Sequence, residues 1–190
     1  QLLAYSNKDS ISAVALIRAY RLRGHLLAEL DPLGMRESEY LDELHPEFYG
    51  FKKENYERKI FLNGVINKKY ANIKEILKFM KKTYCGKIGY EFMHISNPDE
   101  RKWFRDRIEQ DDKALQFTKN GKEAILNKLV QAEGFEKFLA TKYVGTKRFG
   151  LDGGESLIPA LEQIIKIGGQ QQIKEVKIGM SHRGRLNVLA

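Results

Sequence analysis

Three basic side chains stand close together near the end of the sequence, where His182, Arg183 and Arg185 fall within the stretch SHRGR. A guanidinium group donates two parallel hydrogen bonds to a phosphate or a carboxylate. A histidine changes its protonation near neutral pH and can donate to an oxygen atom of a bound molecule. The stretch therefore predicts an anion-binding site, and the competing interpretation is an ordinary solvated loop.

The residues on either side of SHRGR predict the elements that would position it. Val176, Ile178 and Met180 alternate with other residues in the run EVKIGM, a pattern typical of a β-strand. The apolar run at 186–190 then begins a helix. A strand, a loop with glycine and a helix form the first half of a βα unit. In such units the strand ends and the unpaired amides of helix N-termini are where ligands collect.

The segment ahead of this strand is expected to contain a helix within residues 153–169. Ile158, Leu161 and Ile165 repeat at helical spacing, and glycines stand at both ends of the segment. Pro159 is tolerable there because it lies in the first turn.

The sequence before about residue 145 has mainly helical periodicity. Further helices are expected at 10–24, 73–86, 98–108, 124–130 and 135–143. Gly134 separates the last two. Asn97 supplies an N-cap for the helix that begins with Pro98, the first helical position at which proline is favoured.

Two turns and one irregular stretch interrupt these helices. In DPLG, Pro32 sets its own φ and Gly34 can adopt a positive φ. Asn63 and Gly64 predict a short hairpin within residues 60–66. Residues 35–59 are polar and weakly patterned, so we expect them to be irregular.

Together these patterns predict an α/β fragment in two parts. Residues 1–145 would form a mainly helical N-terminal region, and residues 146–190 would begin a parallel α/β domain. The sequence starts with glutamine and stops within a helical pattern, so we expect it to be part of a longer protein.

Composition narrows the class of protein. Hydrophobic residues make up 42% of the 190 positions, enough for a packed core. Cys85 is the single cysteine, which excludes an intrachain disulfide and a cysteine-based metal cage. His25, His45 and His94 are isolated, so no residues are assigned to metal binding. No apolar run reaches the length of a membrane span.

The net charge is compatible with a second class of protein. The 33 basic residues exceed the 25 acidic ones and give +8, which favours polyanionic partners and makes a basic nucleic-acid-binding module an alternative. However, the basic residues are interleaved with acidic ones. The sequence also has neither zinc-finger spacing nor an RNA-recognition aromatic motif. We therefore expect no nucleic-acid partner.

Several long blocks carry a resemblance to a known family. They are AYRLRGHLLAELDPLG at 19–34, YCGKIGYEFMHISNPDERKWFRDRIE at 84–109, KRFGLDGGESLIPALEQII at 147–165 and GMSHRGRLNVLA at 179–190. In these blocks the chain resembles the first, thiamine-diphosphate-dependent component of the 2-oxoglutarate dehydrogenase complex, over nearly its whole length. Two positions depart from the family pattern: Asp152, where Glu is usual, and Ser181, where a small apolar residue or Pro is common.

The resemblance implies an oxidoreductase of the tricarboxylic acid cycle. Its reaction would be oxidative decarboxylation of 2-oxoglutarate, with succinyl transfer to the lipoyl group of the second component of the complex. The α/β domain would bind thiamine diphosphate, and Arg185 would contact this cofactor near its diphosphate. His182 would be the catalytic and substrate-binding residue that meets the oxygens of the 2-oxo acid. Arg183 would be either a weaker candidate for contact with the ligand or a member of a structural ion pair. The GLDGGES loop would help to shape the same cavity.

The resemblance also implies Mg²⁺, whose ligands would lie beyond residue 190. We therefore expect that the chain alone neither holds the cofactor tightly nor decarboxylates. A homodimer in the bacterial cytoplasm or the mitochondrial matrix is implied as well. Three alternatives stay open: a related 2-oxoadipate dehydrogenase, a decarboxylase that releases the aldehyde, and a scaffold role for residues 1–145.

Overall fold

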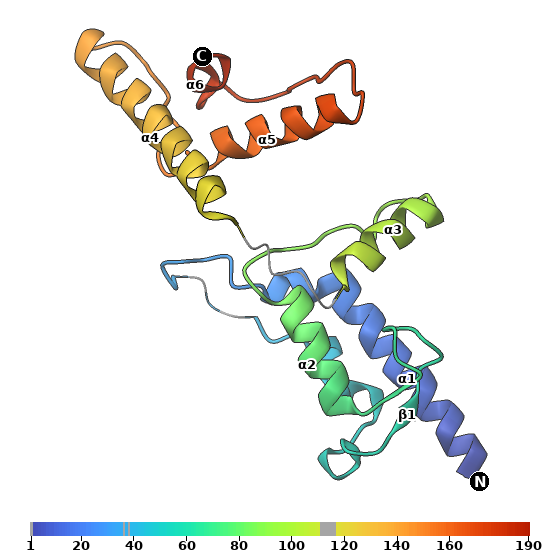
Figure 1. Cartoon of the computed structure of the whole chain (residues 1–190). Helices are drawn as coiled ribbons and strands as arrows, with labels where there is room; N and C mark the ends of the chain where they lie inside the picture. The colour runs from blue at the N-terminus through green and yellow to red at the C-terminus, as the bar shows by residue number, and fades with distance from the viewer. Residues whose placement is uncertain (1, 36, 38, 111–116) are drawn as a thin grey trace. The chain divides into compact units, whose positions relative to one another are not determined.

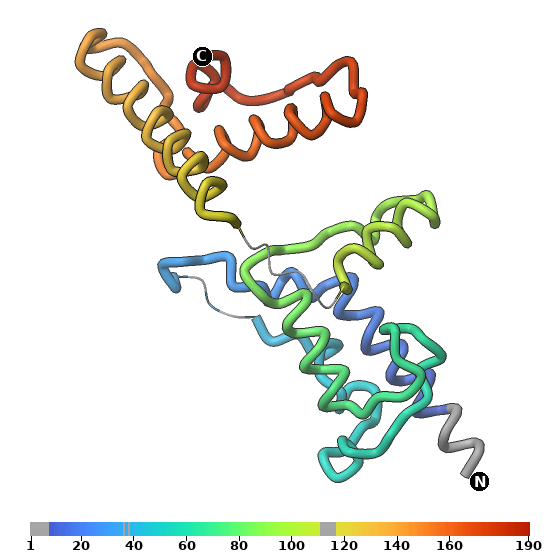
Figure 2. The backbone as a smooth tube through the Cα atoms, in the orientation of Figure 1, coloured from blue at the N-terminus to red at the C-terminus, as the bar shows by residue number. Residues whose placement is uncertain are grey.

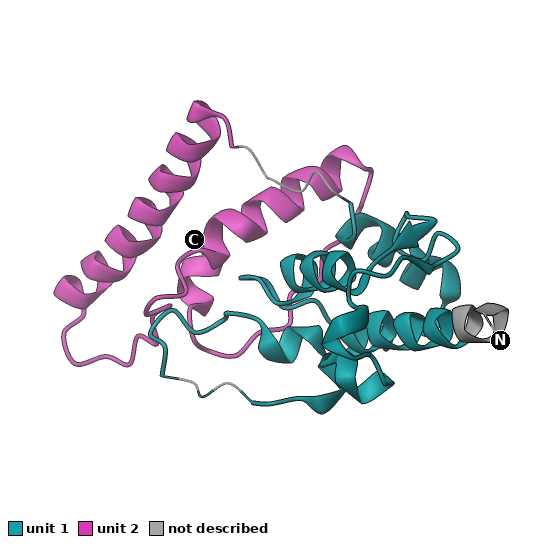
Figure 3. Cartoon of the chain, turned by 90° about the horizontal axis from the view of Figure 1, so that it is seen from below, with its two compact units in different colours: residues 1–113 teal, residues 114–190 magenta. Residues whose placement is uncertain are grey.

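The computed structural model describes residues 2–35, 37, 39–110 and 117–190 of the chain. Its backbone divides into two compact units, unit 1 with residues 1–113 and unit 2 with residues 114–190 (Figure 3). The described residues are mainly helical, with a small two-stranded antiparallel sheet. The expectation of a mainly helical N-terminal region is therefore confirmed. Among the described helices, none is long and apolar enough to cross a membrane.

Unit 1 is built around two packed helices, α1 and α2 (Figure 1). Its elements are α1 (Leu2–Arg23), β1 (Ile60–Phe61), β2 (Tyr70–Ala71), α2 (Ile73–Tyr84), α3 (Pro98–Ile108) and 3-10 helices at Gly24–Leu27, Asp42–Leu44, Pro46–Tyr49 and Lys53–Asn55. Leu16 and Ile17 from α1 meet Ile76 and Met80 from α2 in a continuous apolar core. Removing these side chains from water is the main contribution to the stability of unit 1.

The helix ends in unit 1 follow from local sequence. Asn72 and Glu75 form a reciprocal capping box at the start of α2, which satisfies two backbone N–H groups. Asn97 accepts from the N–H groups of Asp99 and Glu100 at the start of α3, with Pro98 at the first helical position. The predicted cap at Asn97 is confirmed. The expected DPLG turn is confirmed as well, with Gly34 at φ 64°.

A buried ionic network ties the middle of unit 1 together. Arg21 of α1 donates from Nε and Nη2 to the two carboxylate oxygens of Glu109, at 2.7 and 2.8 Å. The hydroxyl of Tyr84 donates to the same carboxylate at 2.7 Å, and Arg21 also donates to the carbonyl of Val65. The side chains of Arg21 and Glu109 are 10% and 4% exposed. This network compensates the cost of burying two opposite charges.

The predicted hairpin at 60–66 is wrong in its pairing. Asn63 and Gly64 do adopt positive φ, at 49° and 82°, and form a turn. However, β1 pairs with β2, in the register Ile60 with Ala71 and Phe61 with Tyr70. A second residue with positive φ, Asn67, lengthens the connection, so the second strand lies further along the chain than a two-residue loop would place it.

Unit 2 contains α4 (Lys119–Lys142), α5 (Leu157–Gln170) and α6 (Arg185–Leu189). In this unit α4 contacts both α5 and α6. The predicted break at Gly134 is wrong, because α4 runs through it as one helix of 24 residues. A glycine inside a helix costs only about 1 kcal/mol relative to alanine, and the helix formers on both sides outweigh it.

The predicted strand at 175–180 is also wrong for this chain. Figure 2 shows this segment as part of an extended connection between α5 and α6, and none of its residues belongs to a strand. A strand requires a hydrogen-bonded neighbour, and no other described segment lies in that position. The predicted boundary between residues 145 and 146 falls inside unit 2, where α4 and α5 contact each other. An α/β domain beginning there remains a prediction about a longer protein.

Candidate functional site

The SHRGR stretch forms a turn that is docked on the loop at residues 149–153. The N–H of Gly184 donates to the carbonyl of Phe149 at 2.7 Å. Gly184 is buried with φ 73°, and a Cβ added to it would lie 2.3 Å from Cδ2 of Leu151. A glycine is therefore required here both by the backbone conformation and by the close approach of the loop.

Arg183 closes the turn onto the same loop. Its guanidinium pairs with the carboxylate of Asp152 and donates to the carbonyl of Gly150 at 3.0 Å. Asp152, the residue that departs from the family pattern, is thus long enough to reach the guanidinium. The predicted structural ion pair of Arg183 is confirmed. Its positive charge is largely neutralised, which leaves it less able to bind a ligand.

His182 lies against an aromatic ring from the docked loop. The ring centroids of His182 and Phe149 are 4.2 Å apart, with an angle of 53° between the ring planes. Phe149 has φ 39° and Asp152 has φ 44°, values that non-glycine residues rarely adopt. Such strained backbone is common where a loop must present a side chain for function. Phe149 was not assigned a role from the sequence, although it belongs to the KRFGLDGGES block.

Arg185 is the cation of the turn that stays available. Its side chain is exposed and makes no hydrogen bond or ion pair with any residue that the structure describes. The backbone amides nearby are partly used, since Gly184 donates to Phe149 and Arg185 donates to the carbonyl of His182 at 3.3 Å. Fewer backbone N–H groups than expected are therefore free to bind an anion at the start of α6. The guanidinium of Arg185 is the group best able to meet an anion.

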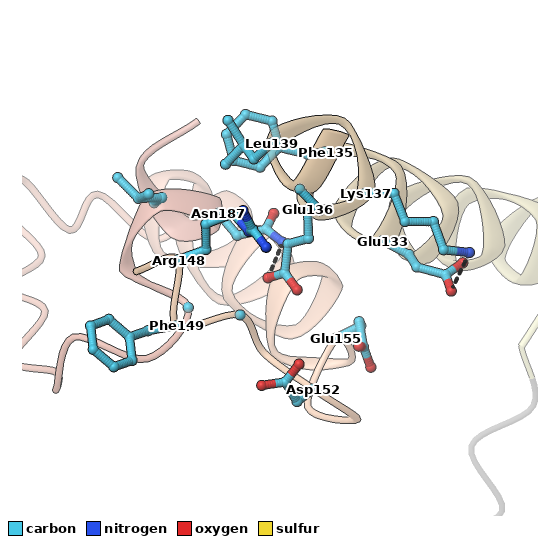
Figure 4. A pocket seen from close by; sticks show the side chains of 14 residues that line it. Glu133, Phe135, Glu136, Lys137, Leu139, Arg148, Phe149, Asp152, Glu155 and Asn187 are labelled. Carbon is cyan, nitrogen blue, oxygen red and sulfur yellow. Dashed lines mark hydrogen bonds and ion pairs between the residues drawn. The ribbon is translucent and has the colours of Figure 1, made fainter. Parts of the chain in front are cut away.

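A cavity of about 340 Å³ lies beside the turn, between α4, the 149–153 loop and the start of α6 (Figure 4). Its wall includes Glu136 of α4, Gly150 of the loop, and Gly184 and Asn187 of the turn and helix. The Gly153 N–H donates to Glu155 and lowers the pKa of that exposed carboxyl group. The predicted proximity of the GLDGGES loop to the SHRGR turn is therefore observed.

The other titratable candidates lie in unit 1, apart from the turn in sequence. His25 lies in the 3-10 helix that follows α1. Its Nε2 is 3.8 Å from a carboxylate oxygen of Glu91. Burial raises the pKa of the Cys85 thiol, which makes it a poor nucleophile. Among the described residues, no cluster of three or more His, Cys, Asp or Glu side chains could hold a metal ion.

The sequence of the chain is similar to part of the sequence of known dehydrogenase components. Relatives from Brucella canis, Brucella suis and Brucella abortus are each 60% identical to it over 185 residues, which is 96% of this chain. All three are named 2-oxoglutarate dehydrogenase E1 component. No family model matches the chain.

The match confirms the resemblance found in the sequence: the chain is homologous to part of these E1 components. The aligned region covers 18% of each relative, so the chain spans less than a fifth of the length of the proteins it matches.

Proposed function

We propose that this chain is part of a thiamine-diphosphate-dependent 2-oxoglutarate dehydrogenase that decarboxylates 2-oxoglutarate and transfers the succinyl group to a lipoyl-bearing second component. The observation that carries this proposal is 60% identity over 96% of the chain to proteins named 2-oxoglutarate dehydrogenase E1 component. The geometry of unit 2 adds support, because it joins the SHRGR turn to the GLDGGES loop. The turn also carries Arg185, which has no partner among the described residues.

In this function the SHRGR turn would supply positive charge to the cofactor and would hold His182 close to the substrate. The exposed guanidinium of Arg185 would donate to the diphosphate of the cofactor, with the two-pronged geometry that guanidinium groups offer to phosphate. His182 would donate to an oxygen of the 2-oxo acid, with its ring held by Phe149. Thiamine diphosphate, when bound, supplies the electron sink for loss of carbon dioxide. The residues present fit one end of such a cofactor, because the guanidinium of Arg185 has no acidic partner among the residues that the structure describes.

The remaining parts of the proposal concern the longer protein. Mg²⁺ would accompany the diphosphate, with ligands from residues beyond 190, and the functional unit would be a homodimer within the 2-oxoglutarate dehydrogenase complex. The curated relatives are bacterial, which favours the bacterial cytoplasm over the mitochondrial matrix. An α/β domain that begins near residue 146 would bind the cofactor.

Kinetics of the full-length enzyme test the two side-chain roles. Arg185→Ala should weaken thiamine diphosphate binding by about tenfold or more, the loss expected for one charge-assisted hydrogen bond. His182→Ala should lower kcat with cofactor saturating. Lys142→Ala, which removes an exposed cation at the end of α4, is the matched control and should change neither. Unchanged catalysis in His182→Ala would remove this residue from the mechanism.

Two further measurements separate the alternatives. The ratio of kcat/KM for 2-oxoglutarate to that for 2-oxoadipate identifies the preferred acid, and a preference for 2-oxoadipate would overturn the substrate assignment. Calorimetry of the 190-residue chain with thiamine diphosphate and Mg²⁺ should give no binding in the micromolar range. Micromolar affinity would instead show that the chain holds a complete cofactor site.

A further inference from the structure

One carboxylate connects all three parts of the candidate site. Oε1 of Glu136, on α4, accepts from the backbone N–H of Leu151 in the docked loop and from Nδ2 of Asn187 in α6, both at 2.9 Å. Nδ2 of Asn187 also donates to the carbonyl of Ala132, at 3.0 Å. Figure 4 shows the Asn187 and Glu136 side chains pointing toward each other in the wall of the cavity.

The contact is tight as well as polar. A Cβ added to Gly150 would lie 2.5 Å from Oε2 of Glu136, so the loop backbone passes directly over the carboxylate. Asn187 is 8% exposed and Leu151 is 7% exposed. Buried donors of this kind cost about 1–3 kcal/mol when they lose their acceptor, so the arrangement favours a single position for the loop.

We propose that Glu136 and Asn187 are positioning residues that fix His182 and Arg185 relative to the loop at 149–153. The proposal rests on the proposed function, since its consequence for the reaction depends on the roles given there to His182 and Arg185. Asn187 stands two residues after Arg185 in α6. Because Glu136 holds Asn187 and Leu151 on the same oxygen, it sets the distance between the start of α6 and the loop that carries Phe149.

This role differs from that of the neighbouring carboxylate on the same helix. Glu133 pairs with Lys137 at 2.8 Å, and their side chains are 58% and 72% exposed. An exposed pair one turn apart contributes only about 0.3–0.5 kcal/mol. Glu133→Ala is therefore a matched control, in which a glutamate is lost from α4 but the loop keeps its acceptor.

The test uses the full-length enzyme and two substitutions of Glu136. Glu136→Ala removes the acceptor and should weaken thiamine diphosphate binding by about tenfold, a loss of about 1.4 kcal/mol. It should also raise the KM for 2-oxoglutarate even when the cofactor is saturating, because His182 shifts with the turn. Glu136→Gln keeps an oxygen in the place of Oε1 and should restore both values to within about twofold of the wild type.

A substitution in the loop tests the same contact from the other side. Gly150→Ala places a methyl group where Glu136 now lies, and should weaken cofactor binding in the wild-type background. In a Glu136→Ala background the space is open, so the same change should have no added effect. Additive losses in this double-mutant cycle would contradict a shared contact.

Hydrogen exchange of the cofactor-free enzyme provides a readout that does not depend on activity. Glu136→Ala should speed exchange in peptides that cover 149–153 and 181–187, whereas Glu136→Gln and Glu133→Ala should leave it unchanged. A merely structural role would instead lower Tm and leave the cofactor affinity and KM of the folded enzyme unaltered, and that result would overturn the proposal. If the wild-type enzyme fails to bind thiamine diphosphate, the proposed function falls. Hydrogen exchange then decides on its own whether the turn is positioned by Glu136.

Discussion

Among single residues, Glu109 has the most unusual surroundings in unit 1. Its carboxylate accepts from the guanidinium of Arg21 and the hydroxyl of Tyr84, and its side chain is 4% exposed. A buried ion pair adds little net stability compared with an apolar pair, but the loss of one partner leaves the other charge buried and uncompensated. The network thus makes unit 1 sensitive to substitution at either charged residue.

We expect Glu109→Ala to lower the free energy of unfolding of unit 1 by about 3 kcal/mol or more, because Arg21 then stays buried without an acceptor. Tyr84→Phe should lower it by about 1 kcal/mol, since the carboxylate keeps both bonds from Arg21.

Urea denaturation of the 190-residue chain measures both changes in stability. The fluorescence of Trp103, the single tryptophan of the chain, is the probe for unit 1. Lys74→Ala, which breaks the exposed pair with Glu57, is the control and should change stability by less than about 1 kcal/mol. An equally small effect of Glu109→Ala would contradict the network's role.

The same tyrosine predicts how stability depends on pH. Burial, together with the nearby Glu109 carboxylate, raises the pKa of Tyr84 well above its ordinary value of 10. In the unfolded chain the phenol loses its proton from about pH 10, while the folded state keeps it. Stability is therefore fully present below pH 10 and is lost as pH rises above it, by up to about 1.4 kcal/mol per pH unit for one proton. Burial also raises the pKa of Tyr20, which acts in the same direction.

Denaturation at a series of pH values between 8 and 11 checks this sign. Tyr84→Phe should remove roughly one proton from the difference between the unfolded and folded states, and so flatten the decline above about pH 10. A variant that declines as steeply as the wild type would assign the alkaline loss to other groups.

At the level of helices, the absence of a Cβ has different consequences at two glycines. Gly24 lies directly after α1, and a Cβ there would be 2.6 Å from Cβ of Tyr84 at the end of α2. Gly134 lies inside α4 with nothing within 4 Å of an added Cβ. Gly24 thus permits the close approach of two segments, whereas Gly134 only lowers the intrinsic stability of a helix.

Alanine at these two positions should therefore have opposite effects. Gly24→Ala should destabilise unit 1 by about 1–3 kcal/mol through overpacking against Tyr84. Gly134→Ala should stabilise unit 2 by up to about 1 kcal/mol through helix propensity. Thermal unfolding followed by circular dichroism reports both changes. Stabilisation by Gly24→Ala would mean that α1 and α2 can separate at no cost.

The sequence predicted those elements whose signals are local. The cap at Asn97 and the helix α2 were predicted correctly because each depends on neighbours a few residues away. The break predicted at Gly134 was wrong because the free-energy cost of one glycine is small compared with the helix propensity of the 24-residue helix around it. The pairing predicted for the hairpin at 60–66 was wrong. The pairing of β1 with β2 also depends on Asn67, whose positive φ is not evident from its identity.

The candidate site was predictable in part for the same reason. The SHRGR turn and the GLDGGES loop were found as blocks, and the ion pair of Arg183 was anticipated. Glu136 was missed, since a glutamate on a helix has no local pattern that separates a buried acceptor from a solvated charge. The positioning role proposed for Glu136 rests on contacts with residues 15 and 51 positions away. Only the folded arrangement brings these residues together.

For the molecule as a whole, the segment at 175–180 carries the clearest conflict between sequence and structure. Its residues alternate as a strand would, yet Val176 and Ile178 are 47% and 46% exposed. Beside it, a groove of about 590 Å³ is lined by Leu161 and Ile165 of α5 together with Ile178. Charged residues, Lys128, Glu162 and Lys166, also line this groove. An alternating segment whose apolar side chains are half exposed matches the edge of a sheet whose neighbouring strand is contributed by other residues.

We expect residues 175–180 to pair with another strand in the full-length protein, as the proposed α/β domain requires. Hydrogen exchange should then show slow amides at 175–180 in the full-length protein and fast ones in the 190-residue chain, because unpaired amides exchange freely with water. Residues 73–84 of α2 are the internal control, since their amides are bonded within the helix and should be protected in both. Ile178→Lys should destabilise the full-length protein by burying a charge, while leaving the 190-residue chain nearly unaffected. Fast exchange at 175–180 in the full-length protein would contradict both the strand and an α/β domain that begins in this part of the sequence.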